Sequence, residues 1–425
     1  MDWHIETKCI QAGWQPKNGE ARVLPIYQST TFRYETAEQM GDLFDLKAEG
    51  DFYTRLGNPT TAAVERKIAA LEGGVGALLT SAGQAATMLA VLNIAHAGDH
   101  IISASAVYGG TFNLFEKTLR ELGIETTFVE PTATAAELEP YFRPNTRLVF
   151  GETLSNPSLC VLDIAEFAAA AHAHRVPLIV DNTFPTPINC RPLEFGADIV
   201  THSTSKYLDG HAVSLGGVIV DGGHFDWTAG NYPELTRPDE SYHGVIYTEQ
   251  FGAGAYIAKA RCHLMRDMGA TPSPFNAFLL SQGIDTLHVR MQRHCENARR
   301  VAEFLQREPR VTWVSFPELP DSPYYELTKK YMPHGTSGVI SFGVKGGREA
   351  AGRFLNALKL AAIATHVADL RTCALHPAST THRQMTDEQL AEAGVTPDLI
   401  RLSVGIENGD DIIEDIRQAL DATEA

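Results

Sequence analysis

The stretch ADIVTHSTSKYLDGH, residues 197–211, decides the fold. It opens with a short apolar run at 199–201 and passes directly into a turn of hydroxyl residues that contains Lys206. A short apolar run that ends in a polar turn is typical of a buried strand in a parallel sheet. Ligands bind beyond the carboxyl ends of such strands, so the sequence places Lys206 at a binding edge.

Similar apolar runs precede and follow this one along the chain. Helical patterns fit residues 84–94 and 164–174 between them, and residues 61–71 before the first run. Strands separated by helices of this length predict an α/β fold with a mostly parallel seven-stranded sheet covered on both faces. The predicted strands are 76–80, 100–103, 125–129, 147–151, 178–180, 199–201 and 217–220.

The chain of 425 residues is too long for one small domain. Residues 1–60 are turn-rich and lack a steady period, which predicts an N-terminal arm with short helices. We expect a large domain over residues 61–269, and a smaller α+β domain over residues 270–425. Within the large domain, residues 222–250 are rich in Gly, Pro, Tyr and Trp and predict a long ordered loop.

Composition excludes several classes of protein. A formal net charge of -17 argues against nucleic acid as a partner, because phosphate backbones need a basic face. The 6 cysteines form no C-x-x-C pair, so neither a zinc site nor a disulfide scaffold is expected, and no metal is predicted. The absence of a signal region and of a long apolar run predicts a cytoplasmic protein without a membrane span.

Lys206 is the first candidate catalytic residue. A free lysine is almost wholly protonated at neutral pH, but burial lowers its pKa and makes the amine nucleophilic. A lysine among Ser203, Thr204 and Ser205 at a strand end is therefore suited to imine chemistry. A surface lysine in a Ser/Thr-rich turn is the alternative interpretation.

Asp181 ends the apolar run in LIVDNTF, residues 178–184. An enzyme that uses pyridoxal 5'-phosphate (PLP) needs a carboxylate at the pyridine nitrogen, so that the ring stays cationic and accepts electrons. The separation from Lys206 leaves room for one helix and one strand, which would put the two residues at neighbouring strand ends. A helix N-cap or a metal ligand is the alternative for Asp181.

A phosphate site fits LLTSAGQAA, residues 78–86, where a strand passes through a small-residue turn into a helix. Free N–H groups and the helix dipole favour an anion there. Turns of this kind are common, so the motif is weak alone. The chain has no Gly-Lys dipeptide, which excludes a Walker A loop.

Three further segments carry candidate binding residues. In an extended segment, Tyr53 and Arg55 fall on the same side and offer a hydroxyl and a guanidinium. Tyr108 follows a strand and is suited to stacking on a flat ring, and Arg401 begins a strand and is suited to clamping a carboxylate. Core packing for Tyr108, a surface ion pair for Arg55 and a structural salt bridge for Arg401 remain alternatives.

Together, these motifs resemble the Cys/Met-metabolism family of PLP enzymes from about residue 7 to about residue 416. The motifs are YTRLGNPT, SAGQAA, VYGGT, SNP, VDNTF, HSTSKYLDGH, HPASTTH and RLSVGIE. The resemblance implies the PLP-dependent transferase fold type I. It also implies a homo-oligomer, a tetramer built as a dimer of dimers, in which the arm reaches the neighbouring subunit's site.

The resemblance implies a role for each matching residue. Lys206 would bond covalently to PLP, Asp181 would pair with its ring nitrogen, and Tyr108 would stack on the ring and assist departure of the leaving group. The phosphate would be bound by Gly83, Gln84, Ser203 and Ser205, and by Tyr53 and Arg55 of a neighbouring subunit. Asn156 would lie near the phenolic oxygen of PLP. The substrate would be bound by Arg401, Tyr53 and Asn156.

Within the family, PIYQSTTF and the FDW…GNYPEL…SYHG segment resemble the O-acetylhomoserine sulfhydrylases. That subgroup would replace the acetate at Cγ of O-acetyl-L-homoserine with sulfide, or another thiol, in methionine biosynthesis. Three positions depart from family patterns. Gly110 stands where methionine γ-lyases carry cysteine, Ala82 stands where the phosphate loop has serine, and His366 or a neighbour replaces a serine near the substrate carboxylate.

Three other functions stay open. Cystathionine γ-synthase and methionine γ-lyase activities are the alternatives within the family. A PLP-binding protein without turnover is the alternative from another class. Such a protein would keep Lys206 and Asp181 but would not require Tyr108 and Arg401, which are both present.

Overall fold

The computed structural model describes residues 3–380, 383 and 396–424, which form two compact units. The first unit comprises Met1–Thr153, Asp163–Thr183 and Arg191–Thr286. The second comprises Leu154–Leu162, Phe184–Cys190 and Leu287–Ala425. The division at residues 60 and 269 stays a prediction, and by compactness helix α13 (Pro274–Asp285) belongs to the first unit.

A seven-stranded sheet forms the centre of the first unit, in the order β1-β7-β6-β5-β4-β2-β3. β7 runs antiparallel to the other six strands, which share one direction, so the prediction of a mostly parallel α/β sheet is confirmed. The strands are β1 (Gly76–Thr80), β2 (His100–Ala104), β3 (Glu125–Val129), β4 (Thr146–Glu152), β5 (Leu178–Asp181), β6 (Ile199–His202) and β7 (Gly217–Asp221).

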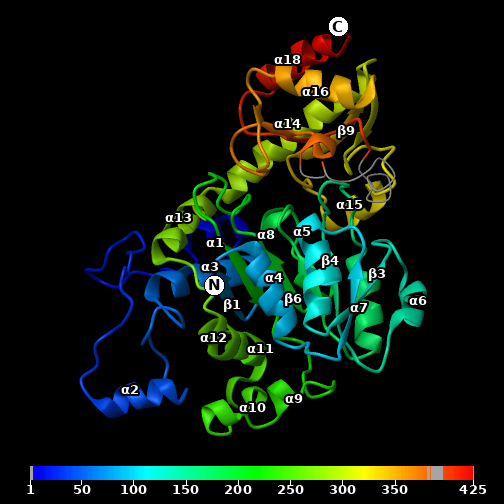
Figure 1. Cartoon of the computed structure of the whole chain (residues 1–425). Helices are drawn as coiled ribbons and strands as arrows, with labels where there is room; N and C mark the ends of the chain where they lie inside the picture. The colour runs from blue at the N-terminus through cyan, green and yellow to red at the C-terminus, as the bar shows by residue number, and fades with distance from the viewer. Residues whose placement is uncertain (1–2, 381–382, 384–395, 425) are drawn as a thin grey trace. The chain divides into compact units, whose positions relative to one another are not determined.

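Helices cover this sheet (Figure 1). Every residue of β2, β4, β6 and β7 is buried, which requires a layer on both faces. α3 packs on β1 and β7, α4 on β6 and β7, and α7 on β4 and β5. The helices before β7 in this unit are α1 (Ile5–Gln11), α2 (Ala37–Phe44), α3 (Pro59–Glu72), α4 (Gly83–Leu92), α5 (Gly109–Asn113), α6 (Ala135–Leu138) and α7 (Ile164–Ala173).

Local sequence sets the ends of α3. The Asn58 side chain accepts a hydrogen bond from the Thr60 N–H at 2.9 Å, and Pro59 occupies the first turn, where its missing N–H is harmless. Gly73 ends the helix in the left-handed region at φ 84°, which glycine adopts without strain. The helix therefore starts two residues before the predicted residue 61.

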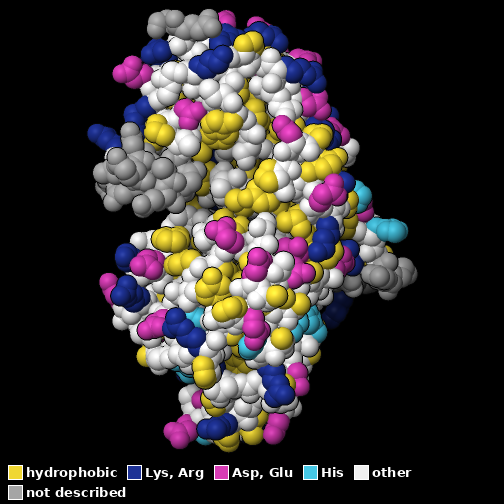
Figure 2. All heavy atoms as spheres, turned by 90° about the vertical axis from the view of Figure 1, so that its right-hand side faces the viewer, with side chains coloured by type: hydrophobic (Ala, Val, Ile, Leu, Met, Phe, Trp, Pro, Cys, Tyr) yellow, Lys and Arg dark blue, Asp and Glu magenta, His cyan; other side chains and the backbone are white. Residues whose placement is uncertain are grey.

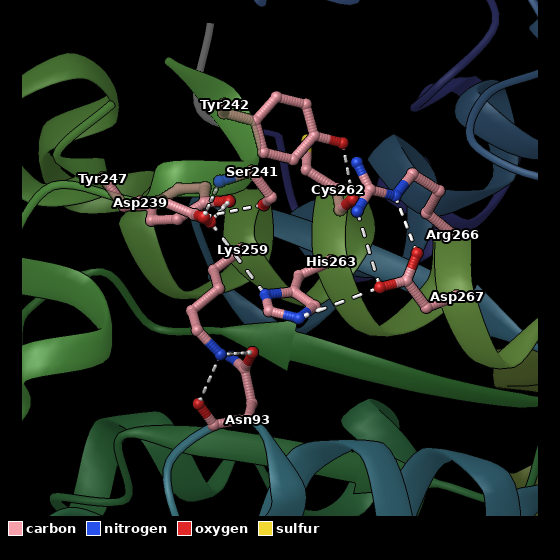
Figure 3. Close-up of polar contacts among 10 residues, drawn as sticks. All are labelled: Asn93, Asp239, Ser241, Tyr242, Tyr247, Lys259, Cys262, His263, Arg266 and Asp267. Carbon is pink, nitrogen blue, oxygen red and sulfur yellow. Dashed lines mark hydrogen bonds and ion pairs between the residues drawn. The ribbon is translucent and has the colours of Figure 1, made fainter. Parts of the chain in front are cut away.

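The segment after β7 contains short helices joined by polar contacts (Figure 3). The Asp239 carboxylate accepts hydrogen bonds from the Ser241 N–H and hydroxyl and from the Tyr247 hydroxyl. These bonds hold in place a stretch that the sequence predicts as an ordered loop. The segment after β7, which continues beyond that predicted loop, includes the helices α9 (Pro233–Thr236), α10 (Tyr247–Phe251), α11 (Ala255–Lys259), η6 (Ala260–Met265) and α12 (Arg266–Met268).

Lys259 joins this segment to the far end of α4. Its buried ammonium group donates to the backbone carbonyl of Asn93 at 2.9 Å and to the Asn93 side chain at 3.3 Å. Asn93 is the C-cap of α4, where a positive charge complements the helix dipole. The segment after β7 therefore supports the helix that begins at Gly83.

The second unit contains a five-stranded sheet in the order β10-β11-β12-β9-β8. Helices α14, α16 and α18 pack against it around an apolar core that includes Phe342 and Phe354. The strands are β8 (Val311–Ser315), β9 (Val339–Val344), β10 (Ala362–Ile363), β11 (Cys373–Leu375) and β12 (Leu399–Ser403). The helices are α8 (Thr186–Asn189), α14 (Leu287–Arg307), α15 (Tyr325–Tyr331), α16 (Gly347–Ala357) and α18 (Gly409–Asp421).

Among the described residues, no helix is long and apolar enough to cross a membrane.

The burial of Lys259 makes stability depend on pH. Burial is the main cause that lowers the pKa of its amine to about 8 from 10.5, although Glu234 and Asp239 oppose the shift. Between these values the folded lysine is neutral and the unfolded lysine is protonated, so stability rises with pH. From pH 8 to 10.5 the wild type should gain about 3 kcal/mol relative to Lys259→Met.

Urea unfolding of both proteins across this pH range measures the difference. Lys345→Met, which removes an exposed lysine, serves as the control and should show no such trend. A constant difference between wild type and Lys259→Met would show that Lys259 does not lose its proton in the folded state.

Candidate active site

The predicted site residues of the first unit, other than Tyr53 and Arg55, lie at the edge of the sheet where its parallel strands end. β1, β2, β4, β5 and β6 end at this edge, and the antiparallel β7 begins there. Register places Glu152 on β4 opposite Asp181 on β5, and Asp181 opposite Thr201 on β6. Lys206 lies in the turn that follows β6, so Asp181 and Lys206 follow neighbouring strands as predicted.

Hydrogen bonds link the end of β5 to the turn after β6. The Thr183 hydroxyl and N–H both donate to Asp181 Oδ1, at 2.5 Å and 2.9 Å. The Thr183 hydroxyl in turn accepts from the Ser203 N–H at 2.8 Å. This chain orients the Asp181 carboxylate and fixes the backbone three residues before Lys206.

A buried layer supports these strand ends from behind. His202 Nε2 lies 2.6 Å from Glu72 Oε1, which also accepts from the Asn182 side chain at 3.0 Å. His202 and Glu72 are both fully buried. Burial raises the pKa of the Asp181 carboxyl, while the hydrogen bond from Thr183 and the nearby His202 oppose that rise.

The turn between β1 and α4 forms a narrow cradle. A β-carbon on Gly83 would lie 2.6 Å from Ser203 Cβ, and one on Gly217 would lie 2.3 Å from the Ala82 carbonyl oxygen. Only glycine allows this approach. Ala82, the N-cap of α4, makes no side-chain cap, so the first N–H groups of the helix are left for a ligand.

Ser205 links the turn after β6 to Gly216, the residue before β7. Its hydroxyl donates to the Gly216 carbonyl at 3.1 Å and accepts from the Gly216 N–H at 3.0 Å. Lys206 begins a tight turn, in which its carbonyl accepts from the Gly210 N–H at 2.7 Å. The backbone around Lys206 is therefore held at both ends.

Tyr108 follows β2 at this edge and leaves 49% of its surface exposed. Its N–H donates to Glu152 Oε1 at 2.7 Å. A β-carbon on Gly110 would lie 2.5 Å from Tyr108 Cε1 and 2.6 Å from Gln84 Nε2. Glycine at this position therefore lets the Tyr108 ring and the Gln84 side chain stay where they are.

Two further predicted residues of this unit, Tyr53 and Arg55, contact each other. The Arg55 guanidinium lies over the Tyr53 ring, 5.0 Å from its centroid. In the part of the chain that the structure describes, neither side chain is hydrogen-bonded or ion-paired to the residues at the strand ends. Their predicted role in another subunit's site stays a prediction.

Arg401 and Asn156 meet in the second unit. The buried Arg401 donates to Asn156 Oδ1 at 3.3 Å and to the His366 carbonyl at 3.1 Å. These bonds hold the guanidinium in a fixed orientation, which a carboxylate clamp requires. The departure noted at His366 leaves this contact intact, because it uses the backbone oxygen.

Sequence reasoning missed Glu152 and Thr183. Glu152 ends β4 and is buried, with 7% exposure. Burial and the like charge of Asp181 raise the pKa of Glu152 well above its usual range. A polar residue that ends an apolar run was the available signal for Glu152, by the same reasoning that identified Asp181.

Comparisons with known proteins agree on one family. Residues 6–421 match the model of the Cys/Met metabolism PLP-dependent enzymes. An O-acetyl-L-homoserine sulfhydrylase of Leptospira meyeri is 44% identical over 98% of this chain and 96% of its own. One from Corynebacterium glutamicum is 47% identical over 97% of this chain and 96% of its own.

A solved structure is similar throughout. It is a putative O-acetylhomoserine (thiol)-lyase from Campylobacter jejuni, 35% identical, with a TM-score of 0.94 over 99% of this chain and 100% of its own. That protein carries a pyridoxyl-lysine monophosphate at its position 205. The predicted fold is confirmed by this likeness.

The raised pKa of Glu152 predicts a pH-dependent effect of Glu152→Gln. Above the usual pKa of 4.5, the folded protein keeps a proton on Glu152 that the unfolded chain releases, so the wild type loses stability as pH rises. The amide of Gln is neutral and can still accept from the Tyr108 N–H. Relative to Glu152→Gln, the wild type should therefore become less stable as pH increases.

Denaturant unfolding of the wild type and Glu152→Gln from about pH 4 to about pH 8 tests this prediction. This range starts near the usual pKa of a glutamate side chain and extends above it. Glu249→Gln, at an exposed position of α10, is the matched control and should give a flat difference. A flat difference for Glu152→Gln as well would mean that Glu152 is ionised beside Asp181.

Proposed function

The chain belongs to the Cys/Met metabolism PLP-dependent enzymes, and from that premise we propose that it replaces the acetate of O-acetyl-L-homoserine with sulfide. The products are L-homocysteine and acetate, in a step of methionine biosynthesis. The observation that carries this proposal is the identity of 44% and 47% to two O-acetyl-L-homoserine sulfhydrylases over nearly the whole chain.

The residues at the sheet edge fit PLP. The glycine-lined turn at Gly83 and the unpaired N–H groups of α4 suit a phosphate. Asp181, oriented by Thr183, supplies a carboxylate for the ring nitrogen. Lys206 supplies an amine in the adjoining turn for the aldehyde.

We propose specific tasks for the chain's own groups. Bound PLP would supply an electron sink for negative charge that develops next to the substrate amine. The Lys206 amine would accept the Cα proton and would then move protons at Cβ. Asp181 keeps the ring nitrogen protonated, and Arg401 holds the substrate carboxylate.

Tyr108 completes the set. With nearly half of its surface exposed at the sheet edge, its ring is free to stack on a flat cofactor, and its hydroxyl assists departure of acetate from Cγ. Glu152 fixes the backbone that carries this ring. Gln84, Ser203 and Ser205 adjoin the phosphate cradle, and Asn156 lies beside Arg401.

We also propose a cytoplasmic homotetramer in which Tyr53 and Arg55 serve the neighbouring subunit's site. Tyr53 leaves 41% of its surface exposed, and among the described residues no carboxylate lies within ion-pair distance of Arg55. A guanidinium without a carboxylate partner is available to a phosphate from another subunit.

Purified protein with O-acetyl-L-homoserine and sulfide should form homocysteine and acetate in equal amounts. The same protein with methionine alone should form little α-ketobutyrate, because Gly110 stands where methionine γ-lyases carry cysteine. Faster release of α-ketobutyrate from methionine than of homocysteine from O-acetyl-L-homoserine would instead indicate a γ-lyase.

Mixing two inactive variants tests the shared site. Lys206→Ala should lose the imine absorbance band and lower turnover by at least about 10³-fold, as loss of a catalytic base does. Arg55→Ala should weaken PLP binding. Coassembly of the two variants should restore activity, because one site of each mixed dimer then combines the wild-type Lys206 and Arg55. No recovery in verified mixed oligomers would place both residues in the same subunit's site.

A further inference from the structure

A cavity of about 550 Å³ lies in the first unit, at the amino ends of its parallel strands. The candidate active site lies at the opposite, carboxyl ends of these strands. It opens where β4 begins, at Thr146 and Arg147, and where the chain enters β5, at Val176. The turn at 229–232, from the segment after β7, closes one side. Its volume falls in the range of small-molecule sites.

The charge of the lining is uniform. Every ionisable group among the lining residues except the Tyr232 phenol is basic, and no Asp or Glu is among them. The whole chain, in contrast, has 52 acidic and 35 basic residues, and both kinds are interspersed over the face shown in Figure 2. The basic lining residues are Arg143, Arg147, His174 and Arg175.

Three of these groups are held by acids outside the lining. Arg147 is buried, bonds Glu234 and lies over the Tyr232 ring at 4.6 Å. Arg143 pairs with Glu125 at 2.6 Å, and His174 with Glu139 at 2.8 Å. The Arg147 guanidinium is thus fixed in the wall, while the partners of Arg143 and His174 are exposed carboxylates that water screens.

Arg175 differs from the other three. Among the described residues its side chain has one hydrogen bond, to the Ala229 carbonyl at 3.4 Å, and no carboxylate within ion-pair distance. Its backbone is left-handed at φ 57°, just after the end of α7, where glycine or asparagine is usual. An arginine in this conformation carries a strain of order 1 kcal/mol that glycine would avoid. Such strain points to a use for the side chain.

The rest of the wall is mixed and closely fitted. Phe142 and Pro144 contribute carbon surface, and Thr146 and Asn231 contribute polar groups. Gly230 brings the closing turn against the end of α7, since a β-carbon there would lie 2.8 Å from the Arg175 carbonyl oxygen. The site therefore combines cationic groups with apolar surface from Phe142 and Pro144.

We propose that this cavity binds a small organic anion, a carboxylate or phosphate ester with an apolar body, through the guanidinium groups of Arg175 and Arg143. The planar fork of arginine matches both oxyanions with paired hydrogen bonds. The Phe142 ring, which stacks on His174 at 4.0 Å, and Pro144 contact the body of the ligand. This site is separate from the phosphate cradle at Gly83, which lies at the other edge of the sheet.

Calorimetric titration of the PLP-loaded protein at low salt tests the site, because the cradle is then filled. Phenyl phosphate and benzoate compare the two head groups, and inorganic phosphate tests the contribution of the apolar body. Phenyl phosphate or benzoate should bind more tightly than inorganic phosphate, and added salt should weaken all three.

Arg175→Gly is the key variant, because it removes the guanidinium and also relieves the backbone strain. It should lower affinity about tenfold or more while leaving thermal stability unchanged or higher. Arg307→Gln, at an exposed position of α14, is the control for the loss of one positive charge. It should bind the organic anions as tightly as the wild type does.

Two results would overturn the proposal. One is the absence of saturable binding of either organic anion to the wild type. The other is an affinity that changes less than about twofold in Arg175→Gly, which would place the bound anion elsewhere. Neither result bears on turnover of O-acetyl-L-homoserine, so the proposed function is tested separately.

Discussion

The pairing of β4, β5 and β6 holds Glu152, Asp181 and Thr201 side by side at one edge of the sheet. A shift of one residue in this register would turn each of these side chains to the opposite face. The turn after β6 would then no longer present Lys206 beside Asp181. Buried apolar residues along all three strands make such a shift costly, and so the core of the first unit determines the chemistry at its edge.

Two neighbouring carboxyl groups at this edge have different surroundings. Burial raises the pKa of Asp181, and two hydrogen bonds from Thr183 and the nearby His202 oppose that rise. Glu152 is buried beside Asp181, which favours its neutral form. Thr183 and His202 thus counteract the effect of burial at Asp181, while Glu152 accepts the hydrogen bond from the Tyr108 N–H.

The segment after β7 contacts α4, which begins at the candidate active site, and also forms part of the arginine-lined cavity. Its Lys259 bonds Asn93 at the end of α4, the helix whose first turn forms the phosphate cradle. Its turn at 229–232 closes the arginine-lined cavity at the opposite edge. The segment after β7, which has no regular sequence pattern, therefore supports the helix of one site and lines the cavity of the other.

The amino-acid sequence by itself determined the alternation of strands and helices, because apolar periodicity and turn residues act over a few neighbouring positions. It also placed Asp181, Lys206, Tyr108 and the Gly83 turn at strand ends, since strand ends are local features. Tertiary structure alone revealed Glu152 as the partner of Tyr108, the Thr183 link to Ser203 and the cavity beside Arg175. Glu152 and Tyr108, like Thr183 and Ser203, are 20 or more positions apart, and several segments build the wall of the cavity. These contacts depend on strand order and register, which no local pattern encodes.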